Sequence, residues 1–263
     1  MSKRLKILSW VVGILIGLIL LGILIAVFVY LPEYMRRVLV FRESNYETYL
    51  TGFPHSLLHA DQDSFYFAEN LNEEQVTKLF EGILEREDFD TFLEEMGTQA
   101  FIVIQDDEVI CEKYFNGAQR DSLLTSFSVA KSFTSALVGI AVEEDYFNSI
   151  DDPITDYLPE LEARDSRFKQ ITIRNILLMA SGLEFQELRW GIFNGDDPLT
   201  SYFPDQRQAA LEFTQTKDSP GQYLQYNKYH PQLLGLIIVR NGLEYGIPWD
   251  EWIKSFYRFA SDL

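Results

Sequence analysis

The longest run of the chain without a charged residue is ILSWVVGILIGLILLGILIAVFVYL, residues 7–31. As a helix with a rise of about 1.5 Å per residue, it would reach roughly 37 Å, more than the ~30 Å hydrocarbon core of a bilayer. Trp10 and Tyr30 stand near its two ends, where aromatic side chains meet a membrane interface. The pattern predicts one transmembrane helix that contacts lipid through residues 7–31.

Residues 1–6 form a basic N-terminus of the kind that opens a secretory signal. The apolar run is too long for a signal peptide, and no small-residue cleavage site follows it, so we expect an uncleaved signal anchor. The charges do not decide its orientation, because three basic residues stand on each side of the run: Lys3, Arg4 and Lys6 before it, Arg36, Arg37 and Arg42 after it.

The remaining chain divides into a connector and one domain. Residues 32–71 show no sustained hydrophobic period and are expected to form a juxtamembrane connector. The domain is expected over residues 72–263. A helix over residues 73–96, between Asn72 as its cap and Gly97 as its stop, precedes two β-rich runs, 100–104 and 109–115, that form a hairpin.

Composition excludes one class of partner. The net charge of −18 would repel the phosphates of a nucleic acid, and no basic stripe offsets it. Cys111 is the only cysteine, so no intramolecular disulfide forms, and its strand-like context favours a buried thiol. His55 and His59 are spaced like a helical metal pair, but Pro54 precedes them and no third ligand stands nearby, so we expect no metal site.

A serine and a lysine stand three positions apart in SFSVAKSF, in front of an apolar run. Three residues make nearly one helical turn, so Lys131 is expected on the same face as Ser128 and within reach of its hydroxyl. The helix N-terminus adds positive potential and free N–H groups, which suit an anionic intermediate. Apolar positions on two adjoining faces, among them Val129, Phe133 and Ile140, predict a largely buried helix.

The spacing alone is weak support for chemistry, because Ser166 and Lys169 share it. Those two residues stand in a charged turn, where solvation keeps both groups unreactive. For Ser128 and Lys131 the residues leave two interpretations open. One is a nucleophile with its base; the other is a capping serine beside a lysine whose stem packs on apolar surface.

Three stretches in sequence order carry a resemblance to a known family: LLTSFSVAKSFTSALVGIAVEEDYFNSIDDPITDYLPEL, ITIRNILLMASGL and SPGQYLQYNKYHPQLLGLII. Together they resemble the serine hydrolases related to class C β-lactamases, which include penicillin-binding-protein-like carboxypeptidases, carboxylesterases and nylon-oligomer (6-aminohexanoate-dimer) hydrolases. The resemblance implies a β-lactamase-like α/β fold, an antiparallel sheet flanked by helices plus a helical domain, with the site between them. By the habit of this family the catalytic domain would lie outside the cytoplasm, and with the anchor expected over residues 7–31 the chain would be a single-pass protein of the cell membrane.

By this resemblance Ser128 is the acylated nucleophile, Lys131 is the base that takes its proton, and Tyr226 is a second acid/base that serves the leaving group. No metal or organic cofactor is implied. The usual Tyr-x-Asn motif is replaced by Tyr226-Asn227-Lys228, which is nearer to the nylon-oligomer hydrolases than to true β-lactamases. Asn227, Lys228 and His230 are the expected substrate-binding residues, and a satisfied structural histidine is an equal alternative for His230.

The family's third motif, a Lys or His followed by Thr or Ser and Gly, is not found after Tyr226; Arg240-Asn241-Gly242 comes too soon. The expectation is therefore a fold that is incomplete at its C-terminus and nearly inactive by itself. The expected function is a membrane-anchored serine hydrolase that acts through an acyl-enzyme on an ester, amide or D-peptide-like bond of a small-molecule or peptide-like substrate. The alternative is a catalytically inactive truncated homologue or a binding module of the same fold.

Overall fold

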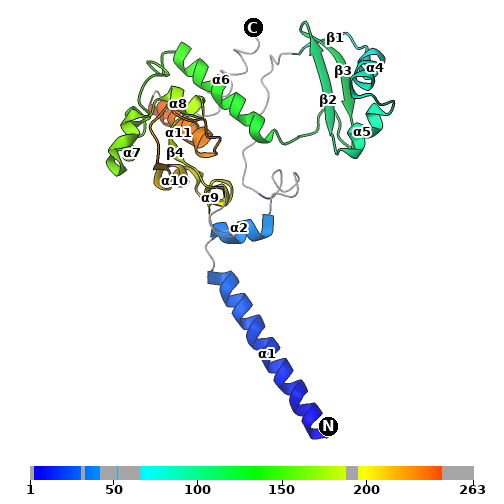
Figure 1. The fold of residues 1–263 in the computed structure, drawn as a ribbon, viewed down its shortest axis with the longest axis vertical. Helices are drawn as coiled ribbons and strands as arrows, with labels where there is room; N and C mark the ends of the chain where they lie inside the picture. The colour runs from blue at the N-terminus through cyan, green and yellow to red at the C-terminus, as the bar shows by residue number, and fades with distance from the viewer. Residues whose placement is uncertain (1–2, 31–32, 42–51, 53–65, 188–194, 245–263) are drawn as a thin grey trace. The chain divides into compact units, whose positions relative to one another are not determined.

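The structure is a computed structural model that describes residues 3–30, 33–41, 52, 66–187 and 195–244 (Figure 1). The chain divides into two compact units. We call the described residues of 45–140 the sheet unit, and those of 1–44 and 141–244 the helical unit. His55, His59 and the residues after 244 lie outside the described residues, so the expectations about them stay predictions.

Two helices open the chain: α1, Lys3–Tyr30, and α2, Glu33–Phe41 (Figure 1). The helical conformation expected for most of residues 7–31 is present in α1. Among the residues that the structure describes, however, no helix meets both the length and the apolar character that crossing a membrane takes. The transmembrane span predicted over residues 7–31 is therefore not supported.

The sheet unit is built on three strands in the order β1-β3-β2. These are β1, Ala68–Glu69; β2, Ala100–Gln105; and β3, Glu108–Tyr114. β2 and β3 form the predicted antiparallel hairpin, while β1 joins β3 in parallel. Asp106 and Asp107 both have positive φ, 52° and 61°, as the two central residues of a tight hairpin turn require. Cys111 lies in β3 and is fully buried, as expected, and burial raises the pKa of its thiol.

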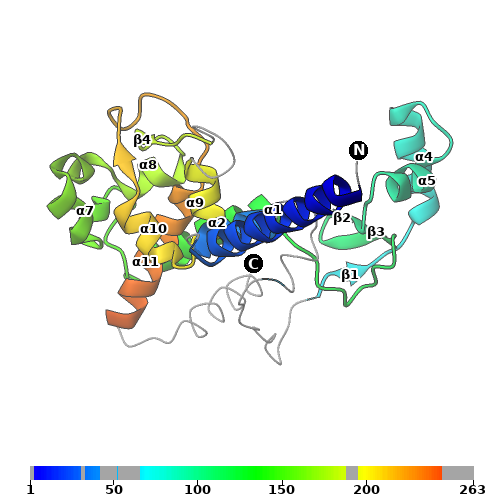
Figure 2. The same ribbon diagram turned by 90° about the horizontal axis from the view of Figure 1, so that it is seen from below.

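Two helices pack on this sheet, α4, Glu73–Leu84, and α5, Phe89–Glu95 (Figures 1 and 2). The single helix predicted over residues 73–96 is therefore wrong in its middle, because α4 ends at Leu84 and its C-cap, Glu85, has a φ of +52°. The reversal lets Phe89 stack on Phe80 at 5.2 Å, and both rings meet Phe101 of β2 edge to face. A straight helix would carry Phe89 away from the sheet, so burial of this aromatic cluster outweighs helix continuity.

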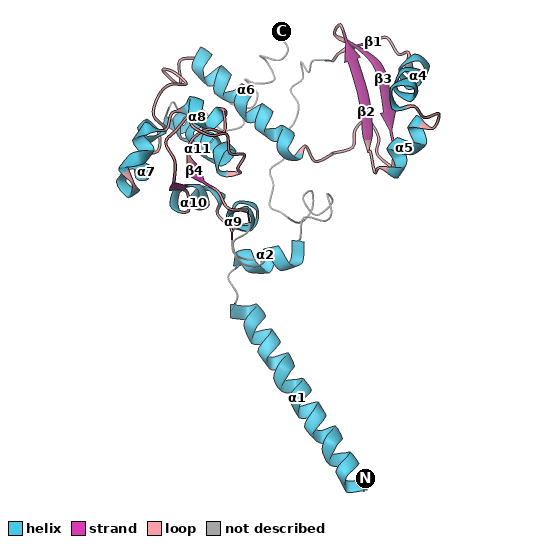
Figure 3. Cartoon of the chain, in the orientation of Figure 1, coloured by secondary structure: helices cyan, strands magenta, loops and turns pink. Residues whose placement is uncertain are grey.

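The helical unit packs short elements around α11, Tyr229–Glu244 (Figure 3). They are η2, Ile154–Asp156; α7, Pro159–Arg164; η3, Ser166–Gln170; α8, Ile173–Leu177; β4, Leu183–Glu184; α9, Asp196–Tyr202; α10, Gln206–Glu212; and β5, Gln215–Thr216. β4 and β5 pair antiparallel. The core between α7, α8 and α11 consists of fully buried aliphatic side chains: Leu161, Ile173, Ile176, Leu233 and Ile237. Thr172 caps α8 through a reciprocal pair of bonds with Asn175, as its position before the helix predicts.

Candidate active site

Ser128 stands at the head of α6, Ala130–Glu143, within the short turn η1, Phe127–Val129. Lys131 Nζ lies 3.0 Å from Ser128 Oγ and donates a hydrogen bond to it. The lysine thus returns to the serine after three residues, as the spacing predicts. The hydroxyl lies within the distance that proton transfer to a general base requires.

The backbone immediately before Ser128 is strained. Phe127 has φ +43°, in the left-handed region that bulky L-residues rarely adopt. Such strain persists only where the surrounding structure holds it, and it gathers at functional sites. The turn also uses one backbone donor, because Val129 N–H donates to Ser126 O at 3.0 Å. That N–H is therefore not among the free groups expected beside Ser128.

The first turns of α6 are less buried than the apolar pattern predicts. Val129 and Phe133 are 60% and 50% exposed, whereas Ile140 and Ala141 are buried. Lys131 is half-buried and Ser128 is exposed. The prediction of a largely buried helix is thus wrong for these turns, because the period of apolar residues marks an apolar face without saying that another element covers it.

The second Ser-x-x-Lys pair serves as an internal comparison. Lys169 Nζ lies 2.7 Å from Glu162 Oε1, and both side chains are exposed. This lysine therefore forms a solvated surface ion pair, in agreement with the interpretation of residues 166–169 as a charged turn.

Tyr226 belongs to the helical unit, in the segment 221–228 that leads into α11, and it is 53% exposed. The residues after it are fixed to partners. Asn227 is buried, and its Oδ1 accepts a hydrogen bond from His230 N–H in the first turn of α11. Lys228 Nζ lies 2.7 Å from Asp197 Oδ1 and 2.7 Å from Ser201 Oγ, both on α9.

His230 is buried, and its Nε2 lies 2.6 Å from Ser181 Oγ. Burial lowers the pKa of the His230 ring to about 4, so the imidazole is neutral at neutral pH. The substrate-binding role expected for Asn227, Lys228 and His230 stays a prediction. The contact between Ser181 and His230 was not predictable from the sequence, because no local pattern joins a serine to a histidine 49 positions later.

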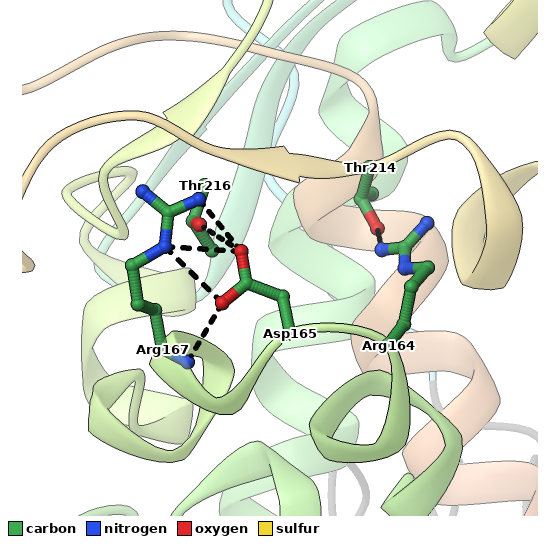
Figure 4. A network of polar contacts seen from close by, with 5 residues as sticks. All are labelled: Arg164, Asp165, Arg167, Thr214 and Thr216. Carbon is green, nitrogen blue, oxygen red and sulfur yellow. Dashed lines mark hydrogen bonds and ion pairs between the residues drawn. The ribbon is translucent and has the colours of Figure 1, made fainter.

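The structure brings Ser128 and Lys131 together in the sheet unit, and it describes Tyr226 within the helical unit. Separately from these residues, a hollow of about 290 Å³ lies beside η3 and β5, with Arg167, Thr216, Lys217 and Ser219 in its wall. Its arginine is already paired, because the Asp165 carboxylate accepts hydrogen bonds from Arg167 and from Thr216 Oγ1 (Figure 4).

The family model named Beta-lactamase matches residues 86–255, which include all the predicted catalytic positions. The chain belongs to this family. The resemblance carried by the three stretches around Ser128, Ser181 and Tyr226 is therefore confirmed.

Two proteins with a related name are similar to parts of this Beta-lactamase-family chain. A 6-aminohexanoate-dimer hydrolase of Paenarthrobacter ureafaciens is 31% identical over 100 residues, 38% of this chain and 25% of that protein. A solved structure from Bacillus anthracis, described as a 6-aminohexanoate-dimer hydrolase, matches with a TM-score of 0.56 at 19% identity. The match covers 70% of this chain and 50% of that one, so the chain has part of a β-lactamase-like α/β fold and spans about half of the solved structure.

Proposed function

We propose that this chain is a serine hydrolase that cleaves an ester, amide or D-peptide-like bond through an acyl-enzyme. The observation that carries the proposal is the 3.0 Å contact between Lys131 Nζ and Ser128 Oγ at the head of α6. The strained Phe127 next to the serine supports it, because capping alone does not require a bulky residue at positive φ.

The proposed mechanism is acyl transfer in two halves. Lys131, in its unprotonated form, takes the Ser128 hydroxyl proton while Oγ bonds to the carbonyl carbon, and a tetrahedral oxyanion forms. The oxyanion collapses, the bond to the leaving group breaks, and Tyr226 passes a proton to that group. Water then attacks the acyl carbon and gives a proton to the Tyr226 oxygen, while Lys131 returns its proton to Ser128 Oγ as the bond from that oxygen to the acyl carbon breaks and the acid is released.

The substrate class rests on the relatives. Two similar proteins are named for the hydrolysis of a 6-aminohexanoate dimer, a compound whose two units are joined by an amide. A linear amide between short amino acids is therefore the first substrate to test, and activated esters are the simplest probes of the same acylation step. The predicted localisation, a single-pass protein of the cell membrane with its catalytic domain outside the cytoplasm, stays a prediction that cell fractionation can test.

A fluorophosphonate probe tests the proposal on the full chain. We expect a covalent adduct on the peptide that contains Ser128, and we expect none in Ser128→Ala. Ser166→Ala removes the serine of the solvated Ser-x-x-Lys pair and should be labelled like the wild type. If the folded chain takes up no probe at Ser128, the hydrolase proposal is wrong and the alternative of a binding module with the same fold is favoured.

A further inference from the structure

The segment that carries Tyr226 is hydrogen-bonded to one loop, residues 179–182, which follows α8. Gln225 N–H donates to Met179 O at 2.8 Å, and Gly221 N–H donates to Ala180 O at 2.7 Å. These bonds fix the chain on the N-terminal side of Tyr226 at two points. The position of the tyrosine backbone therefore depends on the conformation of this loop.

The loop is itself strained. Met179 has φ +54°, a conformation that a long L-side chain rarely adopts. Strain of this kind persists only when neighbouring contacts over-determine it. The buried side chain of Ser181 supplies such contacts, because its Oγ accepts a hydrogen bond from Leu183 N–H at 3.2 Å and lies 2.6 Å from His230 Nε2.

The hydrogen bonds assign the proton on the His230 ring. Asn227 Oδ1 accepts from His230 N–H, so the Asn227 amide nitrogen is the atom that faces Nε2, and Ser181 can donate its O–H to the same Nε2. The Asn227 amide nitrogen lies 3.4 Å from Nε2. Nε2 is thus the acceptor, and Nδ1 carries the proton and faces the thioether sulfur of Met179. Burial keeps this ring neutral, so both nitrogens keep these roles near pH 7.

His230 therefore joins the two sides of the Tyr226 segment. Through Ser181 and Met179 it contacts the loop that binds Gln225, and through Asn227 it contacts the residue that follows Tyr226. We propose that His230 and Ser181 are positioning residues that fix Tyr226 for proton transfer to the leaving group. The inference deepens the proposed function and rests on it, since it takes Tyr226 as the second acid/base.

The first measurement does not depend on activity. 3-Fluorotyrosine is incorporated at position 226 of the full chain, and its fluorine resonance is compared with that of the urea-denatured chain. In the otherwise wild-type protein we expect a single fluorine resonance that is displaced from its position in the denatured chain. In Ser181→Ala we expect this resonance to shift toward the denatured position, or a second resonance to appear. Thr214→Val is the matched control, because it removes another buried hydroxyl, which bonds Ala210 O and Arg164; its resonance should match the wild type.

The second measurement is the hydrolysis of a linear amide between short amino acids, because its leaving amine must be protonated. Ser181→Ala should lower kcat by about tenfold or more while KM changes by less than about twofold, because misplaced proton transfer slows chemistry and leaves binding intact. Thr214→Val should keep kcat within about twofold of the wild type. His230→Gln serves as the second variant if Ser181→Ala does not fold.

The outcomes separate this inference from the proposed function. If the wild-type chain shows neither turnover nor a fluorophosphonate adduct, the proposed hydrolase function is wrong. The fluorine resonance still decides in that case whether Ser181 positions Tyr226. An active wild type whose fluorine resonance and kcat are unchanged in Ser181→Ala overturns the positioning role. Equal losses of kcat in Ser181→Ala and Thr214→Val also overturn it, since they indicate general destabilisation.

Discussion

At the residue scale, His230 makes stability depend on pH in a defined direction. In the folded chain the pKa of His230 is about 4, because burial disfavours the imidazolium. In the unfolded chain an exposed histidine has a pKa of about 6.5. Between these values the unfolded chain binds the extra proton, so the stabilisation is complete above pH 6.5 and is lost as the pH falls toward 4. The loss over this window is about 3 kcal/mol at most.

Urea unfolding of the wild type and of His230→Gln at pH 7, 5.5 and 4.5 measures this contribution. We expect the free energy of unfolding of the wild type to fall more steeply with decreasing pH than that of the variant. Asp165, whose pKa Arg167 holds well below its usual range, loses its stabilisation only at lower pH (Figure 4). Parallel pH profiles for the two proteins would contradict a neutral, desolvated His230.

At the element scale, Gly182 connects the loop after α8 to β4. Its φ is +74°, and a Cβ at this position would stand 2.1 Å from Asp218 O. Its own carbonyl accepts hydrogen bonds from Lys217 N–H and Asp218 N–H, so the backbone cannot move away without breaking these two bonds. Gly182→Ala should therefore lower the free energy of unfolding by about 2 kcal/mol or more.

Gly139→Ala is the matched control for that substitution. Gly139 lies inside α6, and a Cβ there meets nothing within 4 Å. The change should raise the free energy of unfolding by up to about 1 kcal/mol, because alanine favours helix. Urea midpoints of both variants check the pair, and an unchanged midpoint in Gly182→Ala would show that the loop has no need of a glycine.

The elements that local patterns predict are those whose cause is local. The hairpin of β2 and β3 follows from its two β-rich runs and the polar turn between them, and the start of α8 follows from Thr172. The break at Glu85 was not predictable in this way, since its cause is the contact of Phe80 and Phe89 with a later strand. The same holds for Ser181, whose partner lies far along the chain.

At the scale of the whole molecule, family membership was predictable because three ordered stretches carry it, and the family match over residues 86–255 confirms it. The Ser128–Lys131 contact was predictable because helical geometry alone brings the pair together. Helical geometry does not predict how Tyr226 relates to that pair, because Tyr226 belongs to the other unit and no local rule joins the three residues. The apolar composition of residues 7–31 predicted a helix correctly, since α1 forms there. It did not predict a membrane span correctly, since no helix among the described residues is long and apolar enough to cross a membrane.

Trapping of the acyl-enzyme shows whether Ser128 attacks the substrate with Lys131 as its base. The full chain is mixed with an activated ester, quenched in acid within milliseconds to minutes, digested and analysed by mass spectrometry. We expect one acyl group on the peptide that contains Ser128. In Lys131→Arg we expect its rate of formation to fall by at least about 10²-fold, because arginine keeps the charge but cannot deprotonate. Lys169→Arg, which makes the same substitution in the solvated Ser166–Lys169 pair, is the control, and its Ser128 should be acylated at the wild-type rate. Ester turnover with no acyl group on Ser128 would show that this serine is not the nucleophile, and acylation of Lys131→Arg at the wild-type rate would show that Lys131 is not its base.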